Sequence, residues 1–490
     1  MKKRGLSVFL AVMMLAGTMA VGASAATVTD SGTCGDNLTW VYTSDGTLTI
    51  SGTGEMDDWD DNDETPWDDY AGDVTEVVLR DGLTSIGDYA FSSCMMLEEI
   101  SIPEGVTRIG REAFCACYSL SSVELPETLT EIGYRAFIGC ALRSVEIPDS
   151  VTSLGAGAFY TCTRMESVTL PEGLTEIPDD LFGACWSLTS ITIPESVTSI
   201  GDGAFYCCEG LTSIRIPESV TSIGGKAFSG CLNLTEIYFL GDCPDFAQNV
   251  FWGDRSTSNR YDTPSSYIKY VTATAYYPEG NSTWASSKLQ DYGGDITWVA
   301  CSAAYMAFTD LDTPDESNWY YDGVTYVLES GLMNGTGSMT FEPGTATTRS
   351  MIVTILYRLA GEPEVEGTSS FSDVVSGSWY EDAVIWAEQN DIAEGYGNGK
   401  FGVSDEVSRE QIATFLYRYA EHEGMDVSSS EDLSDYPDAG EVSSWAETEL
   451  GWAVAEGLVN GQGVGDETYL APGDDAMRSE TAVILMRFSA

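Results

Sequence analysis

The strongest constraint in this chain is an internal repeat with a period of 23 residues. An apolar residue followed by Phe recurs seven times at this interval, which is shortened once to 22. In every copy Ile or Leu stands four residues before the pair, and Cys stands three residues after the Phe. A unit this short cannot bury its own apolar side, whereas stacked copies share one core, so the repeat predicts a solenoid over residues 83–240. The pairs are Ala90-Phe91, Ala113-Phe114, Ala136-Phe137, Ala158-Phe159, Leu181-Phe182, Ala204-Phe205 and Ala227-Phe228.

Between the pairs lie segments such as Leu188 to Pro194, where apolar and polar residues alternate as in a short strand that Pro ends. We expect these strands to form a parallel sheet on one face, with the Ile/Leu-Gly-x-x-Ala-Phe turns packed behind it. The pattern resembles the BspA-like leucine-rich repeat of bacterial surface proteins, which implies an α/β leucine-rich repeat solenoid. By this resemblance, residues 26–82 form an N-terminal β cap with an acidic loop, and residues 241–307 form a C-terminal cap and linker.

Seven of the twelve cysteines occupy the same position of the repeat. Equivalent positions on successive rungs point in parallel, so their sulfurs do not turn toward one another as a disulfide requires. We therefore predict a ladder of buried thiols that behave as small apolar side chains, with a metal or redox role as the alternative. The ladder consists of Cys94, Cys117, Cys140, Cys162, Cys185, Cys208 and Cys231.

After residue 301 the period changes to about 60 residues. Three copies begin at Phe308, Phe371 and Leu433, and each contains an Asp, then a Trp, then two apolar helical stretches. An Arg opens the second stretch, close to a Ser or Thr of the kind that caps helices. The copies resemble three tandem S-layer homology modules at residues 308–370, 371–432 and 433–490, which implies an all-α domain.

In the family that these modules resemble, three modules form a pseudo-threefold unit that binds pyruvylated secondary cell-wall polysaccharide in grooves between modules. A guanidinium at a helix N-terminus suits a carboxylate such as a pyruvate ketal, because a bidentate pair adds to the free backbone N–H groups. The resemblance implies that an Arg, an Asp, a Trp and a Gly of each module form the grooves. These residues are Arg349, Arg409, Arg478, Asp310, Asp373, Asp435, Trp319, Trp379, Trp445, Gly335, Gly395 and Gly461.

The family's Thr-Arg-Ala-Glu signature is incomplete in this chain. The first copy keeps Thr348, the third keeps Glu480, and the Arg stands in all three. We therefore do not expect every groove to be active. The alternative for each Arg is a solvated position or a structural partner of a nearby Asp, and the alternative for each Trp is a place in the core.

The charge of the chain excludes several classes of function. It has 77 Asp and Glu against 22 Lys and Arg, a net charge of -55, and therefore lacks the basic surface that nucleic acids and anionic bilayers attract. A single histidine, His422, cannot supply the usual catalytic triads or His-rich metal sites. A hydrophobic content of 43% favours folded cores over disorder.

Residues 1–25 have the pattern of a secretory signal peptide, with a basic start, an apolar stretch and Ala23-Ser24-Ala25 as the cleavage site. No second long apolar run follows, so we expect no transmembrane segment in the mature chain. We expect a secreted protein that is held non-covalently on the bacterial cell wall.

An acidic segment at residues 55–73 is a weak candidate for calcium binding. Asp58, Asp60, Asn62 and Asp69 have the 1, 3, 5 and 12 spacing of a calcium loop. However, Asp63 replaces the required Gly, and Asp69 replaces the bidentate Glu. We expect a solvated loop, with low-affinity calcium binding as the alternative and no other cofactor.

These features favour a non-enzymatic surface protein, anchored by its C-terminal modules, whose solenoid binds a protein or glycan. The first alternative is a structural S-layer or cell-envelope component that associates with itself. The second is a wall-bound glycosidase, although no part of the chain resembles a catalytic scaffold. The exposed strand positions of the solenoid show no aromatic platform for sugars.

Overall fold

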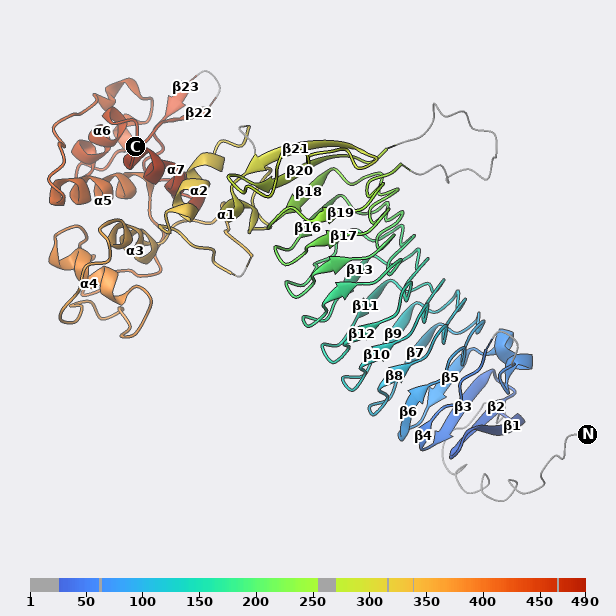
Figure 1. Cartoon of the computed structure of the whole chain (residues 1–490). Coiled ribbons are helices and arrows are strands. Elements are labelled where there is room, and N and C mark those ends of the chain that lie inside the picture. The colour runs from blue at the N-terminus through green and yellow to red at the C-terminus, as the bar shows by residue number, and fades with distance from the viewer. Residues whose placement is uncertain (1–25, 61–63, 254–269, 315–316, 338, 465–466) are drawn as a thin grey trace, which may run out of the picture. The chain divides into compact units, whose positions relative to one another are not determined.

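The computed structural model describes residues 26–60, 64–253, 270–314, 317–337, 339–464 and 467–490 (Figure 1). The predicted signal peptide and Asn62 lie outside these described residues. The chain divides into two compact units, one of residues up to 237 with 242–275 and 285–297, and one of residues 238–241, 276–284 and 298–490. Strands and turns build the first unit and helices dominate the second, which confirms a solenoid followed by a helical region.

Most rungs of the solenoid have two short strand segments, where the sequence predicted a single sheet on one face. Residues 188–194, which the sequence predicted to be a strand, are not one in the structure. In the first ladder β7 (Glu99–Ser101) pairs with β9 (Ser122–Glu124), and β11 (Ser144–Glu146) pairs with β13 (Ser167–Thr169), all in parallel. The second ladder precedes each repeat Gly, and its strands are mostly two residues long, too short for alternation to reveal them. It contains β4 (Gly54–Glu55), β6 (Leu83–Ile86), β8 (Arg108–Ile109), β10 (Glu131–Ile132), β12 (Ser153–Leu154), β14 (Glu176–Ile177), β15 (Ser199–Ile200), β17 (Ser222–Ile223) and β19 (Asp245–Phe246).

The back of the solenoid is built from turns, so the leucine-rich repeat region is a β-solenoid. Residues with left-handed backbone recur along these turns, for example Tyr89 with φ 58° and Ser93 with φ 62°. An α-helix cannot continue through such residues. The Ile-Gly-x-x-Ala-Phe segments therefore pack as turns.

Further strands lie at the two ends of the solenoid, and two of the later strands, β16 and β18, stand at first-ladder positions of the repeat. At the N-terminal end β1, β2 and β3 are antiparallel, and β5 runs parallel to β3. Their bounds are β1 (Val28–Gly35), β2 (Leu38–Thr43), β3 (Thr47–Gly52) and β5 (Glu76–Leu79), and the later strands are β16 (Ser213–Ile216), β18 (Glu236–Phe239), β20 (Thr272–Pro278) and β21 (Asp295–Cys301).

Phenylalanine rings stack through the interior of the solenoid. Successive ring centroids from Phe91 to Phe251 lie 5.1–5.9 Å apart, and every ring is fully buried. Phe251 belongs to an eighth rung, which lies within the residues predicted to form the C-terminal cap. Trp67 covers the first ring at 5.9 Å, and its Nε1 donates to the carbonyl of Ala90 at 2.8 Å. Part of the segment that was expected to be a solvated loop therefore closes the ladder.

The ladder cysteines are free thiols that lie against this stack. All seven are at most 1% exposed. From Cys117 onward each Sγ–H donates to the Phe carbonyl of the preceding rung, at 3.0–3.3 Å. The thiol therefore satisfies a buried carbonyl while it fills space as a small apolar group. Burial raises the pKa of Cys162 to about 12 and also raises the pKa of Cys185 and Cys208.

We predict that the ladder cysteines of the folded protein resist alkylation. At pH 8 a thiol with a pKa of about 12 is ionised in only about one molecule in ten thousand, and the thiolate is the reactive form. Mass spectrometry after native iodoacetamide treatment should find label mainly on the partly exposed Cys115 and Cys243. Guanidinium should make the ladder reactive. Native labelling of Cys162 as fast as that of Cys115 would contradict the prediction.

Three helix pairs form a ring in the described part of the second unit. The first helix of each later pair packs on the second helix of the pair before it, and α2 packs on α7, which closes the ring. This closure requires Gly323 on α2, because a Cβ there would lie 2.7 Å from the Cα of Val483 on α7. The helices are α2 (Tyr321–Glu329) with α3 (Arg349–Leu359), α4 (Glu381–Gln389) with α5 (Arg409–His422), and α6 (Glu447–Ala455) with α7 (Arg478–Phe488), besides the short α1 (Ala303–Met306) and the hairpin β22 (Gln462–Val464) and β23 (Glu467–Tyr469).

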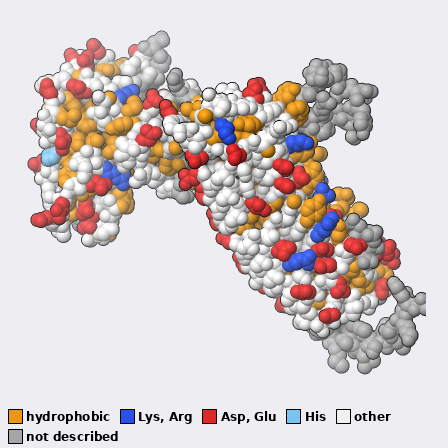
Figure 2. All heavy atoms as spheres, viewed as in Figure 1, with side chains coloured by type: hydrophobic (Ala, Val, Ile, Leu, Met, Phe, Trp, Pro, Cys, Tyr) orange, Lys and Arg blue, Asp and Glu red, His pale blue; other side chains and the backbone are white. Residues whose placement is uncertain are grey.

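One apolar core joins the three pairs, with buried residues from α2 through α7. The surface, in contrast to this core, is rich in acidic side chains. Acidic side chains outnumber basic ones over both units in the face that Figure 2 shows. The net charge of -55 is thus spread over the surface, where it favours solubility.

Candidate ligand grooves between the helical modules

The three predicted arginines each begin the second helix of a module and hold the loop of the next module. They are only 4–6% exposed. Each donates from Nε and Nη2 to two loop carbonyls at 2.6–2.9 Å, and Arg478 reaches back to the first module, so that the arginines fasten the ring. The acceptors are Phe401 and Glu394 for Arg349, Leu470 and Asn460 for Arg409, and Phe341 and Asn334 for Arg478.

The backbone N–H groups at these helix starts are also occupied. The N–H of Arg349 donates to the carbonyl of Asp405 at 2.9 Å, and the N–H of Ser350 donates to that of Val403 at 3.3 Å. The other two helices repeat this arrangement, because the loop of the next module lies across each helix start. The expectation that a ligand carboxylate binds free backbone N–H groups here is therefore wrong. The guanidinium nitrogen Nη1 is the one that the loop does not use.

The predicted aspartates support the same loops from behind. The carboxylate of Asp310 accepts from the N–H groups of Phe341 and Glu342, at 2.8 and 2.6 Å. Asp373 accepts in the same way from Phe401 and Gly402, at 2.7 Å each. Burial opposes ionisation of Asp373, but these N–H donors prevail and lower its pKa. The aspartates therefore position the loop rather than face a ligand.

The sequence prediction for the third aspartate is wrong by three residues. Asp438 is buried and accepts from the N–H groups of Leu470 and Ala471, at 2.9 and 2.6 Å, whereas Asp435 is exposed. The prediction placed Leu433 at the start of the third copy. The structure instead uses Tyr436, whose ring packs on the loop and brings Asp438 to the loop N–H groups.

The predicted glycines let the loops approach these rings. A Cβ at Gly335 would lie 2.5 Å from Cε1 of Phe308, and a Cβ at Gly395 would collide with the ring of Phe371. At Gly461 a Cβ would collide with Thr468. The glycines therefore set the position of the loop, including the carbonyls that accept from the arginines.

The tryptophans lie at the surface and not in the core. Trp319, Trp379 and Trp445 are 63%, 61% and 51% exposed. Trp445 lines a cavity of about 270 Å³ with Arg349, and Trp319 lines one of about 230 Å³ with Arg409. Each of these two grooves combines an Arg of one module, the loop of the next and the Trp of the third.

A second arginine lines each of these cavities, and the sequence analysis missed it. Arg418 lies in the Arg349 groove and Arg487 in the Arg409 groove. Arg358 is their counterpart in the first module. Each stands nine residues after the first Arg of its helix, a rotation of about 900°, so the two arginines of one helix face opposite sides. The recurrence was a detectable signal, but only the helix packing assigns the two arginines to different grooves.

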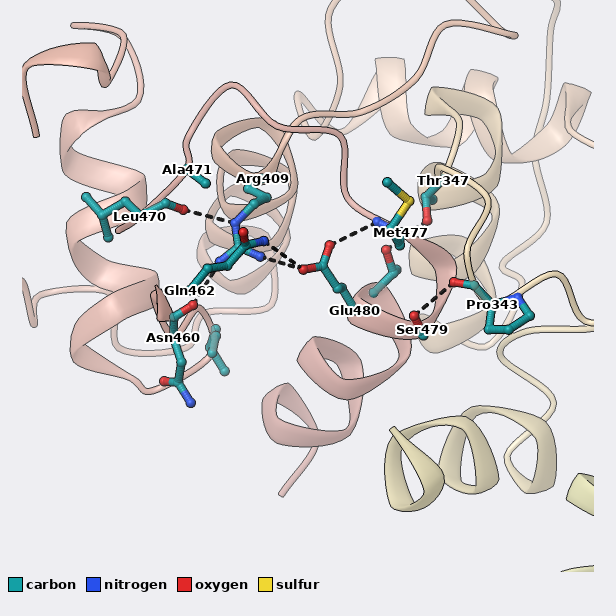
Figure 3. A network of polar contacts seen from close by, with 12 residues as sticks. Pro343, Thr347, Arg409, Asn460, Gln462, Leu470, Ala471, Met477, Ser479 and Glu480 are labelled. Atoms are coloured by element: carbon teal, nitrogen blue, oxygen red, sulfur yellow. Dashed lines mark hydrogen bonds and ion pairs between the residues drawn. The ribbon is translucent and has the colours of Figure 1, made fainter. Parts of the chain in front are cut away.

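The two grooves differ in a residue that the following module contributes. This residue stands two positions after the Arg that begins that module's second helix. Glu480 pairs with Nη1 of Arg409 at 3.0 Å, and its other oxygen accepts from the N–H of Met477 at 3.1 Å (Figure 3). Gln411 stands at the corresponding place in the Arg349 groove. The Glu that the third module retains therefore neutralises the arginine of the second module.

Arg349 and Arg478 have aromatic neighbours in place of a carboxylate. Arg349 lies over the ring of Tyr396 at 4.7 Å, and Arg478 lies over that of Phe341 at 4.6 Å. Burial lowers the pKa of both, yet an arginine stays protonated at neutral pH. Within the described ranges neither forms an ion pair. Asp405 and Asp373 near Arg349, and Glu342 and Asp310 near Arg478, offset only part of the effect of burial on the pKa.

The calcium candidate is partly committed to other contacts. Asp58 pairs with Arg108 at 3.0 Å and accepts from the N–H of Asp88 at 2.8 Å. Among the residues that the structure describes, no group of three or more His, Cys, Asp or Glu is placed to hold a metal ion. Because Asn62 lies outside those residues, calcium binding at this loop stays a hypothesis.

Comparison with known proteins identifies both parts of the chain. The family model described as BspA type Leucine rich repeat region matches residues 70–162 and 130–258, and the S-layer homology domain model matches residues 308–350 and 370–413. The Surface-layer 125 kDa protein of Lysinibacillus sphaericus is 31% identical over 192 residues, which are 39% of this chain and 15% of that protein. An amylopullulanase of Thermoanaerobacterium thermosulfurigenes is 26% identical over 218 residues, which are 44% of this chain and 12% of that enzyme.

Among solved structures, a leucine-rich repeat protein from Bacteroides ovatus aligns over 55% of this chain and 78% of its own, with 25% identity and a TM-score of 0.36. The chain spans less than a fifth of the two curated relatives. It carries a BspA-type leucine-rich repeat region followed by S-layer homology domains, and is a cell-surface protein with S-layer homology anchoring modules. In the described part of the chain, no helix is long and apolar enough to cross a bilayer.

We predict that Asp438, and not Asp435, supports the third module. Replacement of Asp438 by Ala removes two charge-assisted hydrogen bonds to buried N–H groups and should lower the free energy of unfolding of the helical unit by about 2–4 kcal/mol. The exposed Asp435 supplies the matched control, and Asp435→Ala should change it by less than about 0.5 kcal/mol. Urea unfolding followed by circular dichroism measures both. Equal effects would contradict the assignment.

Proposed function

We propose that the protein is a non-enzymatic, secreted surface protein that is held non-covalently on secondary cell-wall polysaccharide and presents its solenoid to a protein or glycan ligand. The observation that carries the proposal is the groove in which Arg349, which forms no ion pair with any described residue, lies with Arg418 and the exposed Trp445. The S-layer homology matches and the relative named Surface-layer 125 kDa protein support a location in the wall.

An anionic sugar fits this combination of side chains. Nη1 of Arg349 and the guanidinium of Arg418 offer donors to a carboxylate such as a pyruvate ketal. Arg418 lies 4.0 Å from the exposed carboxylate of Glu394, and a ligand carboxylate would replace this long contact. The ring of Trp445 offers an apolar face to the C–H groups of the sugar. Because Nε and Nη2 of Arg349 stay bonded to the loop, the ligand binds without opening the ring of modules.

The grooves should differ in their affinity for an anion. In the Arg409 groove the carboxylate of Glu480 already occupies the position that a ligand carboxylate would take. An incoming anion there competes with Glu480 and is repelled by it. The Arg349 groove, with the neutral Gln411 at that place, should be the stronger site.

We predict that Arg418→Gln weakens sedimentation of the full chain with purified cell walls about tenfold, because it removes a charge-assisted contact from the stronger groove. Arg487→Gln, in the neutralised groove, should weaken it less than about threefold. Arg143→Gln is the control, an exposed arginine of the solenoid. Arg349→Ala is unsuitable, since it also releases the neighbouring loop. Equal sedimentation of all variants would refute binding in the grooves.

We also predict that wall binding strengthens from low to moderate salt. The chain carries a net charge of -55, and a polymer bearing carboxylates repels it at long range. Salt screens this repulsion over about 10 Å at 0.1 M, while the contact with the partly buried arginine is screened less. Sedimentation at increasing sodium chloride concentration measures the effect. A steady loss of binding over that range would indicate simple charge attraction.

A further inference from the structure

The turn side of the solenoid contains a cleft that is larger than either module groove. Its volume is about 710 Å³, against about 230 and 270 Å³ for the grooves. It extends over rungs four to eight, and Tyr160, Tyr206, Trp252, Asp180 and Lys226 are among the residues that line it. All of them lie in the first compact unit.

The cleft exists because side chains become small at one place in the repeat. In the second and third rungs the two residues between the repeat Gly and Ala are large and fill this side of the solenoid. Arg111 and Arg135 each lie 5.0 Å from the ring of Tyr134, one on the preceding turn and one beside it. In later rungs the same positions include Ala156, Gly157, Gly203 and Gly225.

Aromatic residues recur on alternate rungs of the cleft. The residue that follows the ladder Phe is, from the fourth rung to the eighth, Tyr160, Gly183, Tyr206, Ser229 and Trp252. The Phe ladder sets the spacing of these rungs at 5.3–5.9 Å, so rings on alternate rungs lie about twice that distance apart.

The first of these rings lies across its small neighbour. A Cβ at Gly183 would be 2.6 Å from Cδ2 of Tyr160, so the ring covers the next rung where that rung has no side chain. Trp252 is 39% exposed at the far end of the series. The result is a row of ring surfaces along the solenoid, with small residues between them.

The polar groups of the cleft suit hydroxyl groups better than an anion. Three carboxylates, those of Asp179, Asp180 and Asp202, face one ammonium group, that of Lys226. Asp179 and Asp202 are fixed, because each accepts from a backbone N–H of the next rung, at 2.7 and 2.5 Å. A fixed carboxylate has further lone pairs that accept from ligand O–H groups. The excess of negative charge disfavours a phosphate or carboxylate ligand.

We propose that this cleft binds a neutral, β-linked glycan that runs along the solenoid. In an extended β-1,4-linked chain every second sugar turns the same face to one side, so rings on alternate rungs can stack on alternate sugars. An α-linked chain coils and loses this register. The site deepens the proposed presentation role of the solenoid and rests on that half of it, but it uses no residue of the helical modules.

The test is titration of the full chain with cellohexaose, chitohexaose and maltohexaose, followed by isothermal titration calorimetry and tryptophan fluorescence. We expect at least one β-linked hexasaccharide to bind and maltohexaose not to bind. Tyr206→Ala should weaken binding about tenfold through loss of one stacking surface. Trp186→Ala, at a tryptophan that is 55% exposed outside the cleft, should leave binding unchanged. Thermal unfolding by circular dichroism verifies that each variant is folded.

Absence of binding for both β-linked probes at millimolar concentration overturns the proposal. So does maltohexaose binding as tight as theirs, or β-linked binding that Tyr206→Ala and Trp252→Ala leave unchanged. The anchoring role is separable from this site. Arg418→Gln should leave hexasaccharide binding unchanged and weaken wall sedimentation about tenfold. Tyr206→Ala should weaken hexasaccharide binding and leave wall sedimentation unchanged.

Discussion

Neither repeat of this protein can bury its own apolar side, and both units depend on neighbours that complete one another. In the solenoid the neighbours are related by translation. The Phe rings stack at 5.1–5.9 Å and the thiols bond to the preceding rung, so the ladder has open ends and Trp67 covers the first. In the helical unit three neighbours are related by rotation, α2 meets α7, and the ring needs no cap.

In the ring the same arginines fasten neighbouring modules and line the proposed ligand grooves. Arg349 donates from Nε and Nη2 to the loop of the next module, and its Nη1 is not used by that loop. Arg349 also lines the cavity. The loop is in turn held by Asp373 and by the close contact of Gly395 with Phe371. These residues build the wall of a groove, which Arg418 and Trp445 line together with Nη1 of Arg349. Gln411 and Glu480 occupy equivalent positions in the two grooves. A change at this one position alters the charge of a groove and leaves the arginine, loop and aspartate contacts unchanged.

The candidate sites of the two units differ in charge. The chain is strongly acidic as a whole, yet two guanidinium groups line each module groove. Partial burial weakens the screening of these charges by water, so they interact more strongly with a ligand charge. The cleft of the solenoid keeps the general acidity and adds aromatic rings. The two proposed ligands, an anionic polymer for the grooves and a neutral glycan for the cleft, are therefore chemically distinct.

The sequence by itself determined the solenoid, its rung length, the buried cysteine ladder, the three-module organisation and the position of Arg349, Arg409 and Arg478. All of these follow from residue periodicity, which is a local property. Only the tertiary structure decided what the groove residues do. It showed that the arginines bond to the loop of the next module and that Asp438, not Asp435, is the third supporting aspartate. It also showed that the tryptophans are exposed and that a second set of arginines, Arg358, Arg418 and Arg487, recurs in the modules. It also brought Tyr160, Tyr206 and Trp252 to one cleft. These outcomes depend on which modules and rungs become neighbours, and contacts between residues so far apart leave no period in the chain.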